Sequence, residues 1–169
     1  FNGCIDILIP IETASRELVY KVYLCHHLAE RGFRCYLGRK LYINYLIKNL
    51  KGYFYLDKGY HEGVSEKIHE AVKKNHGIIV SLDEEGGVDY SDGSTLLGRY
   101  SKALFDNADL TFMWGNKQYE LVKNHIRAAI DVEGGQGGVI DIQKNVSVLD
   151  EISAGGMMSI IRAEIAHLH

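Results

Sequence analysis

Two short polar segments of this sequence carry side chains that could do chemistry. In the first, Glu12 and Arg16 follow an apolar run that ends at Pro10. A carboxylate can take a proton from a hydroxyl group as a general base, and a guanidinium can bind a carboxylate or phosphate through two hydrogen bonds. We therefore take Glu12 as a candidate catalytic residue and Arg16 as a candidate substrate-binding residue. The alternative is a solvated pair, with Glu12 favoured at a helix start by the helix dipole.

The second segment is acidic: Asp83, Glu84 and Glu85 follow the apolar run Ile78–Leu82 and precede Gly86-Gly87. Three adjacent carboxylates repel one another unless water, a cation or an arginine receives them. We take Asp83 and Glu84 as candidate catalytic residues and Glu85 as a candidate substrate-binding residue. One acid could instead cap the next segment through its backbone amides. The two glycines allow the backbone to approach a ligand closely, so we include them in the candidate binding site.

No motif for a metal ion or a nucleotide cofactor is visible. His26 and His27 are adjacent and therefore face different sides of a helix, whereas metal-binding pairs on a helix are spaced four apart. No Gly-x-Gly-x-x-Gly follows the first apolar run, and the glycine-rich stretch Gly134–Gly138 is not followed by Lys-Ser or Lys-Thr. We therefore expect no metal site and no cofactor.

The composition limits the partners of the chain. A formal net charge of −3 without a basic run argues against nucleic-acid binding. No apolar stretch is long enough to cross a bilayer, so we expect no transmembrane segment. Cys4, Cys25 and Cys35 lie in apolar contexts without a Cys-x-x-Cys pair. We interpret them as reduced core thiols of a cytoplasmic protein.

Apolar runs alternate with amphipathic segments, and this alternation must position the two polar segments. We expect strands at Ile5–Ile9, Phe33–Leu37, Gly52–Leu56, Ile78–Leu82 and Leu110–Trp114. We expect helices at Ser15–Arg31, Leu41–Leu50, Glu62–Asn75, Leu97–Asn107 and Asn116–Lys123. This order favours an α/β fold with a Rossmann-like, doubly wound parallel sheet. Ligands of such sheets bind at the carboxyl ends of the strands, where both polar segments would lie.

The first expected helix has a defined start and a defined apolar face. Ser15 is placed to act as its N-cap. Leu18, Val22, Cys25 and Leu28–Ala29 recur at helical spacing, which is typical of the buried face of a helix. In the third strand, Tyr53 and Tyr55 should point to one side, as packing residues or as rings on which a sugar stacks.

With these elements placed, the sequence resembles the bacterial surface carbohydrate biosynthesis proteins, which are glycosyltransferase-like proteins of GT-B type. The resemblance covers about residues 4–122. It is carried by Ile7-Leu8-Ile9-Pro10-Ile11-Glu12 with Arg16-Glu17-Leu18, Ala29-Glu30-Arg31-Gly32-Phe33 with Leu37-Gly38, Leu56-Asp57-Lys58, Ser81-Leu82-Asp83-Glu84-Glu85-Gly86, and Trp114-Gly115-Asn116. The Leu-Asp-Glu-Glu-Gly segment is the most specific of these.

The resemblance implies a function as well as a fold. Residues 1–125 would form the N-terminal, acceptor-side domain of a glycosyltransferase-like protein of bacterial surface polysaccharide biosynthesis. In similar transferases that build Kdo-containing glycans, a carboxylate at the place of Glu12 deprotonates the acceptor hydroxyl. The partners implied are a sugar acceptor and, in a full-length protein, a nucleotide-sugar donor. A cytoplasmic location and a peripheral association with a membrane-bound glycan assembly complex fit this role.

Residues 126–169 do not match that family. They contain no proline and no Gly-Asn-Pro type turn, and consist of a glycine-rich segment and a helix expected over Val148–Leu168. We expect the donor half to be missing, so that this chain alone is incomplete for catalysis. Whether it is an enzyme stays open. The alternatives are a non-catalytic Rossmann-like binding or interaction module and one half of a sugar-nucleotide epimerase.

Overall fold

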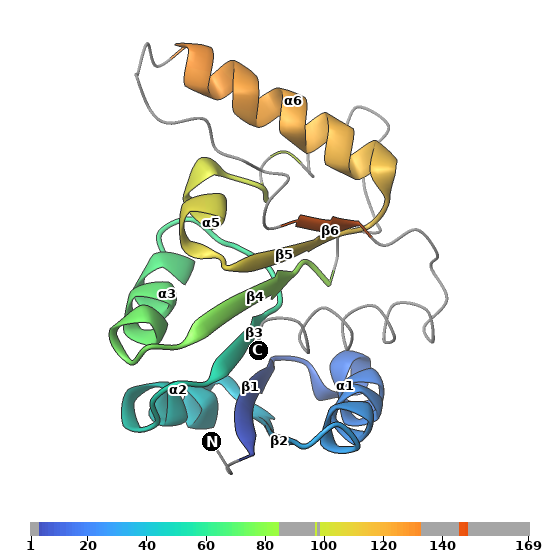
Figure 1. Cartoon of the computed structure of the whole chain (residues 1–169), viewed down its shortest axis with the longest axis vertical. Helices are drawn as coiled ribbons and strands as arrows, with labels where there is room; N and C mark the ends of the chain where they lie inside the picture. The colour runs from blue at the N-terminus through green and yellow to red at the C-terminus, as the bar shows by residue number, and fades with distance from the viewer. Residues whose placement is uncertain (1–3, 85–96, 98, 133–145, 149–169) are drawn as a thin grey trace.

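The computed structural model describes residues 4–84, 97, 99–132 and 146–148, with side chains up to residue 125. These residues form a fully parallel six-stranded sheet in the order β2-β1-β3-β4-β5-β6, with helices on both faces (Figure 1). The strands are β1 (Ile5–Ile11), β2 (Phe33–Arg39), β3 (Phe54–Asp57), β4 (Ile78–Leu82), β5 (Leu110–Met113) and β6 (Val146–Val148). The helices are α1 (Ala14–Ala29), α2 (Lys40–Asn49), α3 (Ser65–Lys74), α5 (Lys102–Asn107) and α6 (Asn116–Val132).

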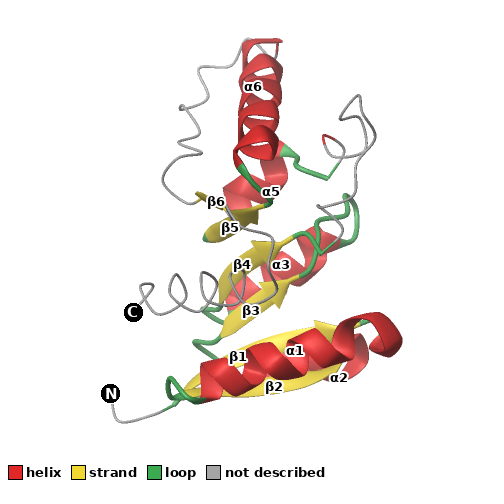
Figure 2. Ribbon diagram, turned by 90° about the vertical axis from the view of Figure 1, so that its right-hand side faces the viewer, coloured by secondary structure: helices red, strands yellow, loops and turns green. Residues whose placement is uncertain are grey.

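The sheet separates two hydrophobic cores, which confirms the doubly wound fold. One core lies between the sheet and α2, α3, α5 and α6. The other lies under α1, which covers β1 and β2 in Figure 2. Successive strand residues alternate between the cores, so Tyr53 and Tyr55 share the first core while Phe54 enters the second. A strand that is buried on both faces must be apolar throughout, which explains the continuous apolar runs of the sequence.

The strand order reverses its direction between β1 and β3. From β1 the chain goes outward to β2, then returns to build β3, β4 and β5 on the other side. Only Ile7 and Leu8 of β1 pair with β3, whereas β1 pairs with β2 along its whole length to Ile11. Pro10 has no N–H to donate, so it does not extend the ladder toward β3. The carboxyl ends of β1 and β3 therefore do not pair with each other, at the point where open α/β sheets bind ligands.

The first half of helix α1 turns a different face to the sheet from the one that its apolar spacing predicts, whereas Leu28 in the second half is buried as expected. Leu18 and Val22 were expected inside but are 42% and 49% exposed. Glu17 and Lys21 are fully buried instead, in line with Leu28. The expectation was wrong because this charged pair is fully hydrogen-bonded inside, which offsets the cost of its burial. Apolar side chains of the same helix are consequently left in solvent.

Several element boundaries also differ from the expected ones. The N-cap of α1 is Thr13 rather than Ser15. Helix α5 begins only at Lys102, where the Ser101 side chain accepts a hydrogen bond from the backbone N–H of Leu104. The expected helix from Val148 to Leu168 and the Gly134–Gly138 stretch lie outside the described residues, apart from Val148 in β6.

None of the three cysteines forms a disulfide, and two of them pack against the core as expected. Cys25 and Cys35 are half-buried between α1 and β2, against the second core, whereas Cys4 is exposed just before β1. The apolar neighbours of Cys4 in the sequence belong to the strand that follows it. Sequence context therefore overstated the burial of Cys4.

We predict that Gly77→Ala destabilises the fold. A Cβ at Gly77 would lie 2.5 Å from Val72 Cγ1 and 2.9 Å from Tyr53 Cε2, both of which are fixed in the core. Overpacking of this kind costs about 1–3 kcal/mol in the free energy of unfolding, measurable by urea denaturation. Gly38→Ala is the control, because its Cβ would meet only Tyr42 Cβ at 4.0 Å. Equal stability of the two variants would contradict the described packing.

Candidate functional site

A cavity of about 120 Å³ lies at the carboxyl ends of β1, β3 and β4. Its lining comes from the loops after these three strands, the first turn of α1 and the segment before α5. The lining residues are Glu12, Arg16, Lys58, Gly59, Tyr60, His61, Asp83, Glu84 and Arg99. The structure therefore brings together four of the residues singled out by the sequence. The other three, Glu85 and Gly86-Gly87, lie outside the described residues.

Glu17 organises the wall of the cavity from behind, although it is fully buried. Its carboxylate accepts hydrogen bonds from the backbone N–H groups of Glu12 at 3.1 Å and Thr13 at 3.0 Å. It also accepts from Lys21 Nζ at 2.8 Å and Lys58 Nζ at 3.0 Å. These four donors fix the loop after β1. Burial by itself would raise the pKa of Glu17, but these donors more than offset that effect and hold it below its usual range.

Lys21 is the buried cation of the site. Its ammonium donates to the Pro10 carbonyl at 2.7 Å and to Glu17 Oε2 at 2.8 Å, and it pairs with Glu84 Oε1 at 2.6 Å. An ammonium has three protons, so its donor capacity is fully used. Lys21 therefore connects the end of β1, helix α1 and the end of β4, and it sets the position of the Glu84 carboxylate.

Glu12 is held between two lysines at the mouth of the cavity. Lys40, the first residue of α2, lies 2.8 Å from Glu12 Oε1, and Lys58 lies 2.6 Å from Oε2. Hydrogen bonds from Lys40 and Lys58 lower the pKa of Glu12 to about 2. Burial by itself would lower the pKa of Lys58, but the hydrogen bonds of Lys58 to Glu12 and Glu17 more than offset this effect and raise the pKa. Glu12 is thus ionised and only weakly basic in this arrangement.

Further contacts from elsewhere in the chain hold the acidic turn after β4. Arg99 Nη1 lies 3.3 Å from Asp83 Oδ2, and the Trp114 indole N–H donates to the Asp83 carbonyl at 2.6 Å. Gly59 passes close by: a Cβ there would lie 3.6 Å from Asp83 Oδ1, and its φ of +153° is one that L side chains rarely adopt. The Glu84 side chain of this turn also neighbours Tyr20. Burial has the largest effect in raising the pKa of Tyr20, and Glu84 raises it further.

Among the described residues, the acids of the site are Glu12, Glu17, Asp83 and Glu84, and the cations are Arg16, Lys21, Lys40, Lys58 and Arg99. These described side chains have a formal charge of +1. The most exposed of the cations is Arg16, whose side chain is 54% exposed. The arrangement can therefore accept hydrogen bonds from hydroxyl groups and receive an anionic group at its open side.

Sequence reasoning missed Glu17, Lys21 and Arg99 as members of the site. A signal existed for the first two, because a glutamate four residues before a lysine can pair with it on one helix face. Such pairs usually lie in solvent, so the spacing did not indicate burial. Lys58, like Glu17, was noted only as part of a segment that carries the resemblance. No pattern pointed to Arg99.

The described part of the chain gives no further class of site. Within it, no three His, Cys, Asp or Glu side chains gather closely enough to hold a metal ion. No described helix combines the length and the hydrophobicity that crossing a membrane requires.

Fold and cavity together define a Rossmann-like α/β domain with a charged, polar site at its topological switch point. Comparison with protein-family models, curated proteins and solved structures gives no significant match to this chain. The resemblance described for the sequence therefore stays a prediction.

We predict that Lys21→Met lowers the free energy of unfolding by about 3–5 kcal/mol at pH 7, because it leaves two carboxylates buried without their shared cation. Chemical denaturation measures this loss. The deficit should shrink in acid: the ionised form of Glu17 stabilises the fold above about pH 4.5 and is lost as pH falls. Lys117→Met on the exposed start of α6 is the control. A loss below about 1 kcal/mol would show that Lys21 is dispensable.

We also predict that Glu12 titrates near pH 2 and that Lys40→Met moves its pKa upward, toward the ordinary value of 4.5. Carboxyl ¹³C chemical shifts measured against pH report this directly. Because the pKa is lowered in the folded state, Glu12 favours folding above about pH 4.5, and this contribution is lost on descent to pH 2. Lys48→Met removes an exposed lysine of the same helix and should leave the titration unchanged.

Proposed function

We propose that this chain is the acceptor-side domain of a glycosyltransferase-like protein of bacterial surface polysaccharide biosynthesis, and that the cavity binds the sugar acceptor. One observation carries the proposal: Glu12, Arg16, Asp83 and Glu84 surround one cavity at the switch point of the sheet. The resemblance implies that the Glu12 carboxylate deprotonates the acceptor hydroxyl, and the residue types of the second segment make Asp83 and Glu84 candidate catalytic residues. The position of all four side chains around one cavity supports a common role.

The size and charge of the cavity limit the kinds of ligand that it can bind. Sites for whole drug-sized ligands usually span about 300–1,000 Å³, whereas this cavity has about 120 Å³. It would therefore take one sugar unit or one end of a longer acceptor. The carboxylates of Asp83 and Glu84 are suited to accept hydrogen bonds from sugar hydroxyls. Arg16, at the open side, is suited to an acidic sugar or a phosphate.

With its low pKa Glu12 is a poor general base, and an anionic acceptor would make it a better one. A general base works best with a pKa near the working pH, and Lys40 and Lys58 hold Glu12 far below it. A carboxylate or phosphate of the acceptor that draws these lysines away would raise the pKa of Glu12. Glu12 would then take the proton of the acceptor hydroxyl, whose oxygen attacks the donor sugar. The donor would be held by a second domain of the full-length protein.

A non-catalytic binding module is the second candidate, and the low pKa of Glu12 favours it. If the lysines stay on Glu12 when ligand binds, the carboxylate is an anchor and not a base. The two functions therefore differ in one measurable quantity, the pKa of Glu12 in the complex. A value that rises by more than one unit with ligand supports the transferase role, and a value that stays near 2 supports the module.

We predict that acidic sugars bind at the cavity and that Arg16→Ala weakens their binding by about 10- to 100-fold, the worth of charge-assisted hydrogen bonds. The measurement is titration of the ¹⁵N-labelled chain with Kdo, neutral hexoses, sugar phosphates and nucleotide sugars. Shifts should map to the loops after β1 and β3. Arg31→Ala, an exposed change after α1, is the matched control. Absence of shifts with every acidic sugar, or an equal loss in both variants, would refute the site.

A further inference from the structure

One segment of the chain has a charge opposite to that of the rest. Residues 31–56, which hold β2, α2 and most of β3, contain no Asp or Glu. Their cations are Arg31, Arg34, Arg39, Lys40, Lys48 and Lys51. Elsewhere 13 cations face 22 acids, so the remainder carries a net charge of −9. The basic segment is therefore a local feature that the overall charge of −3 conceals.

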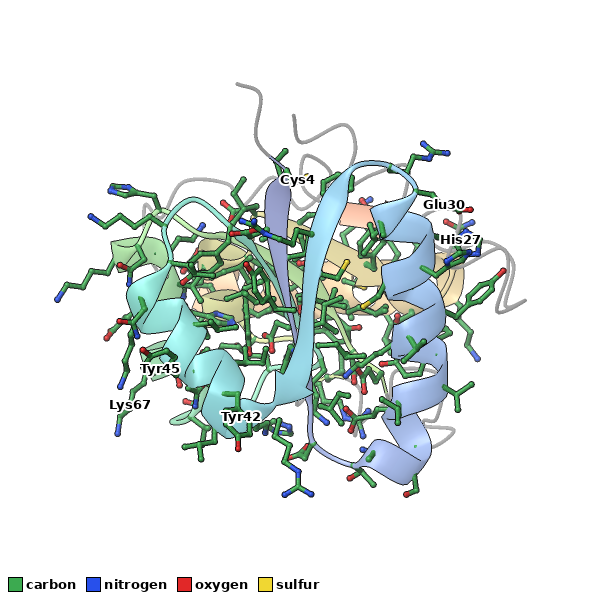
Figure 3. All side chains as sticks on the ribbon, turned by 90° about the horizontal axis from the view of Figure 1, so that it is seen from below. Cys4, His27, Glu30, Tyr42, Tyr45 and Lys67 are labelled. Carbon is green, nitrogen blue, oxygen red and sulfur yellow. The ribbon has the colours of Figure 1, made fainter. Side chains whose placement is uncertain are left out.

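The outer side of α2 is apolar and exposed within this basic segment. Leu41 is 77% exposed, and Tyr42 and Tyr45 are each 66% exposed. The opposite side of the helix buries Ile43 and Ile47 in the core. Figure 3 shows Tyr42 and Tyr45 on the side of α2 that faces away from the strands. These three exposed side chains share one helix face, since positions 41, 42 and 45 are neighbours at helical spacing.

The cations around this face are available for a partner. Arg34 binds Asp6 and Lys40 binds Glu12, but in the described part of the chain no ion pair joins Arg39, Lys48 or Lys51 to an acid. Lys67 of α3 adds a further cation, because it lines a hollow of about 200 Å³ together with Lys48. Positive charge thus flanks the exposed apolar residues on α2 at both of its ends.

We propose that α2 docks this protein on the surface of an anionic lipid bilayer. The helix would lie in the plane of the interface, with Leu41, Tyr42 and Tyr45 among the headgroups, as interfacial helices and aromatic belts do. Arg39, Lys48 and Lys51 would face anionic headgroups. A soluble polyanion would satisfy the charges but would leave Leu41 in water, so lipid is the partner that uses both features. With only one short helix the binding is reversible and weakens with salt.

The test is co-sedimentation of the whole chain with extruded vesicles. We expect binding to phosphatidylcholine vesicles that contain 30% phosphatidylserine, and little binding to pure phosphatidylcholine. Each cation near an anionic surface contributes about fivefold to the partition coefficient, so Lys48→Gln with Lys51→Gln should lower it about 25-fold. The triple change of Leu41, Tyr42 and Tyr45 to Ser should lower it further, and at high salt as well. All five substituted side chains are exposed, so we expect the variants to fold like the original chain.

Lys74→Gln with Lys117→Gln is the matched control, since it removes the same charge from exposed positions outside α2. Equal binding to neutral and anionic vesicles would overturn the proposal, and so would α2 variants that bind like the control. Binding to heparin or single-stranded DNA without binding to vesicles would assign the surface to a soluble polyanion instead. The assay contains no sugar, so its outcome is independent of the function proposed for the cavity.

Discussion

The buried carboxylate of Glu17 is the constraint on which the site depends. A charge without solvent costs several kcal/mol unless its acceptor positions are filled. Here backbone N–H groups of Glu12 and Thr13 and the ammonium groups of Lys21 and Lys58 fill them. Each donor belongs to a segment that borders the cavity or lies directly behind it. Any arrangement that keeps Glu17 satisfied therefore also fixes the loop after β1 against α1 and the loop after β3.

The sheet topology and this network act on the same place for different reasons. The strand order opens the ends of β1 and β3, because β1 pairs with β3 only at Ile7 and Leu8. That opening would leave polar backbone groups unpaired, and Lys21 satisfies one of them by donating to the Pro10 carbonyl. The same ammonium holds Glu84 at the end of β4. The cavity walls are therefore preorganised by buried contacts, which is what precise binding requires.

The sequence predicted the parts of this arrangement that follow from local pattern and topology. Continuous apolar runs predicted the five strands from β1 to β5, and the parallel order then placed Glu12 and Asp83 at one edge. The sequence could not predict the low pKa of Glu12, because the two lysines that lower it come from α2 and from the loop after β3. The burial of Glu17 was missed for a similar reason: spacing favoured Leu18 as the inward residue, and only distant partners reverse that preference.

The cavity and the α2 surface are linked by Lys40. This residue begins α2 and is bonded to Glu12, and a hollow of about 600 Å³ lined by Glu12, Arg39, Lys40 and Leu41 lies between the two regions. Of the contacts that lower the pKa of Glu12, the hydrogen bond from Lys40 has the largest effect. An anion that captures Lys40, from an acceptor in the cavity or a headgroup at α2, removes that contact. Either event makes Glu12 more basic, so membrane docking and acceptor binding would act on the same carboxylate in the same direction.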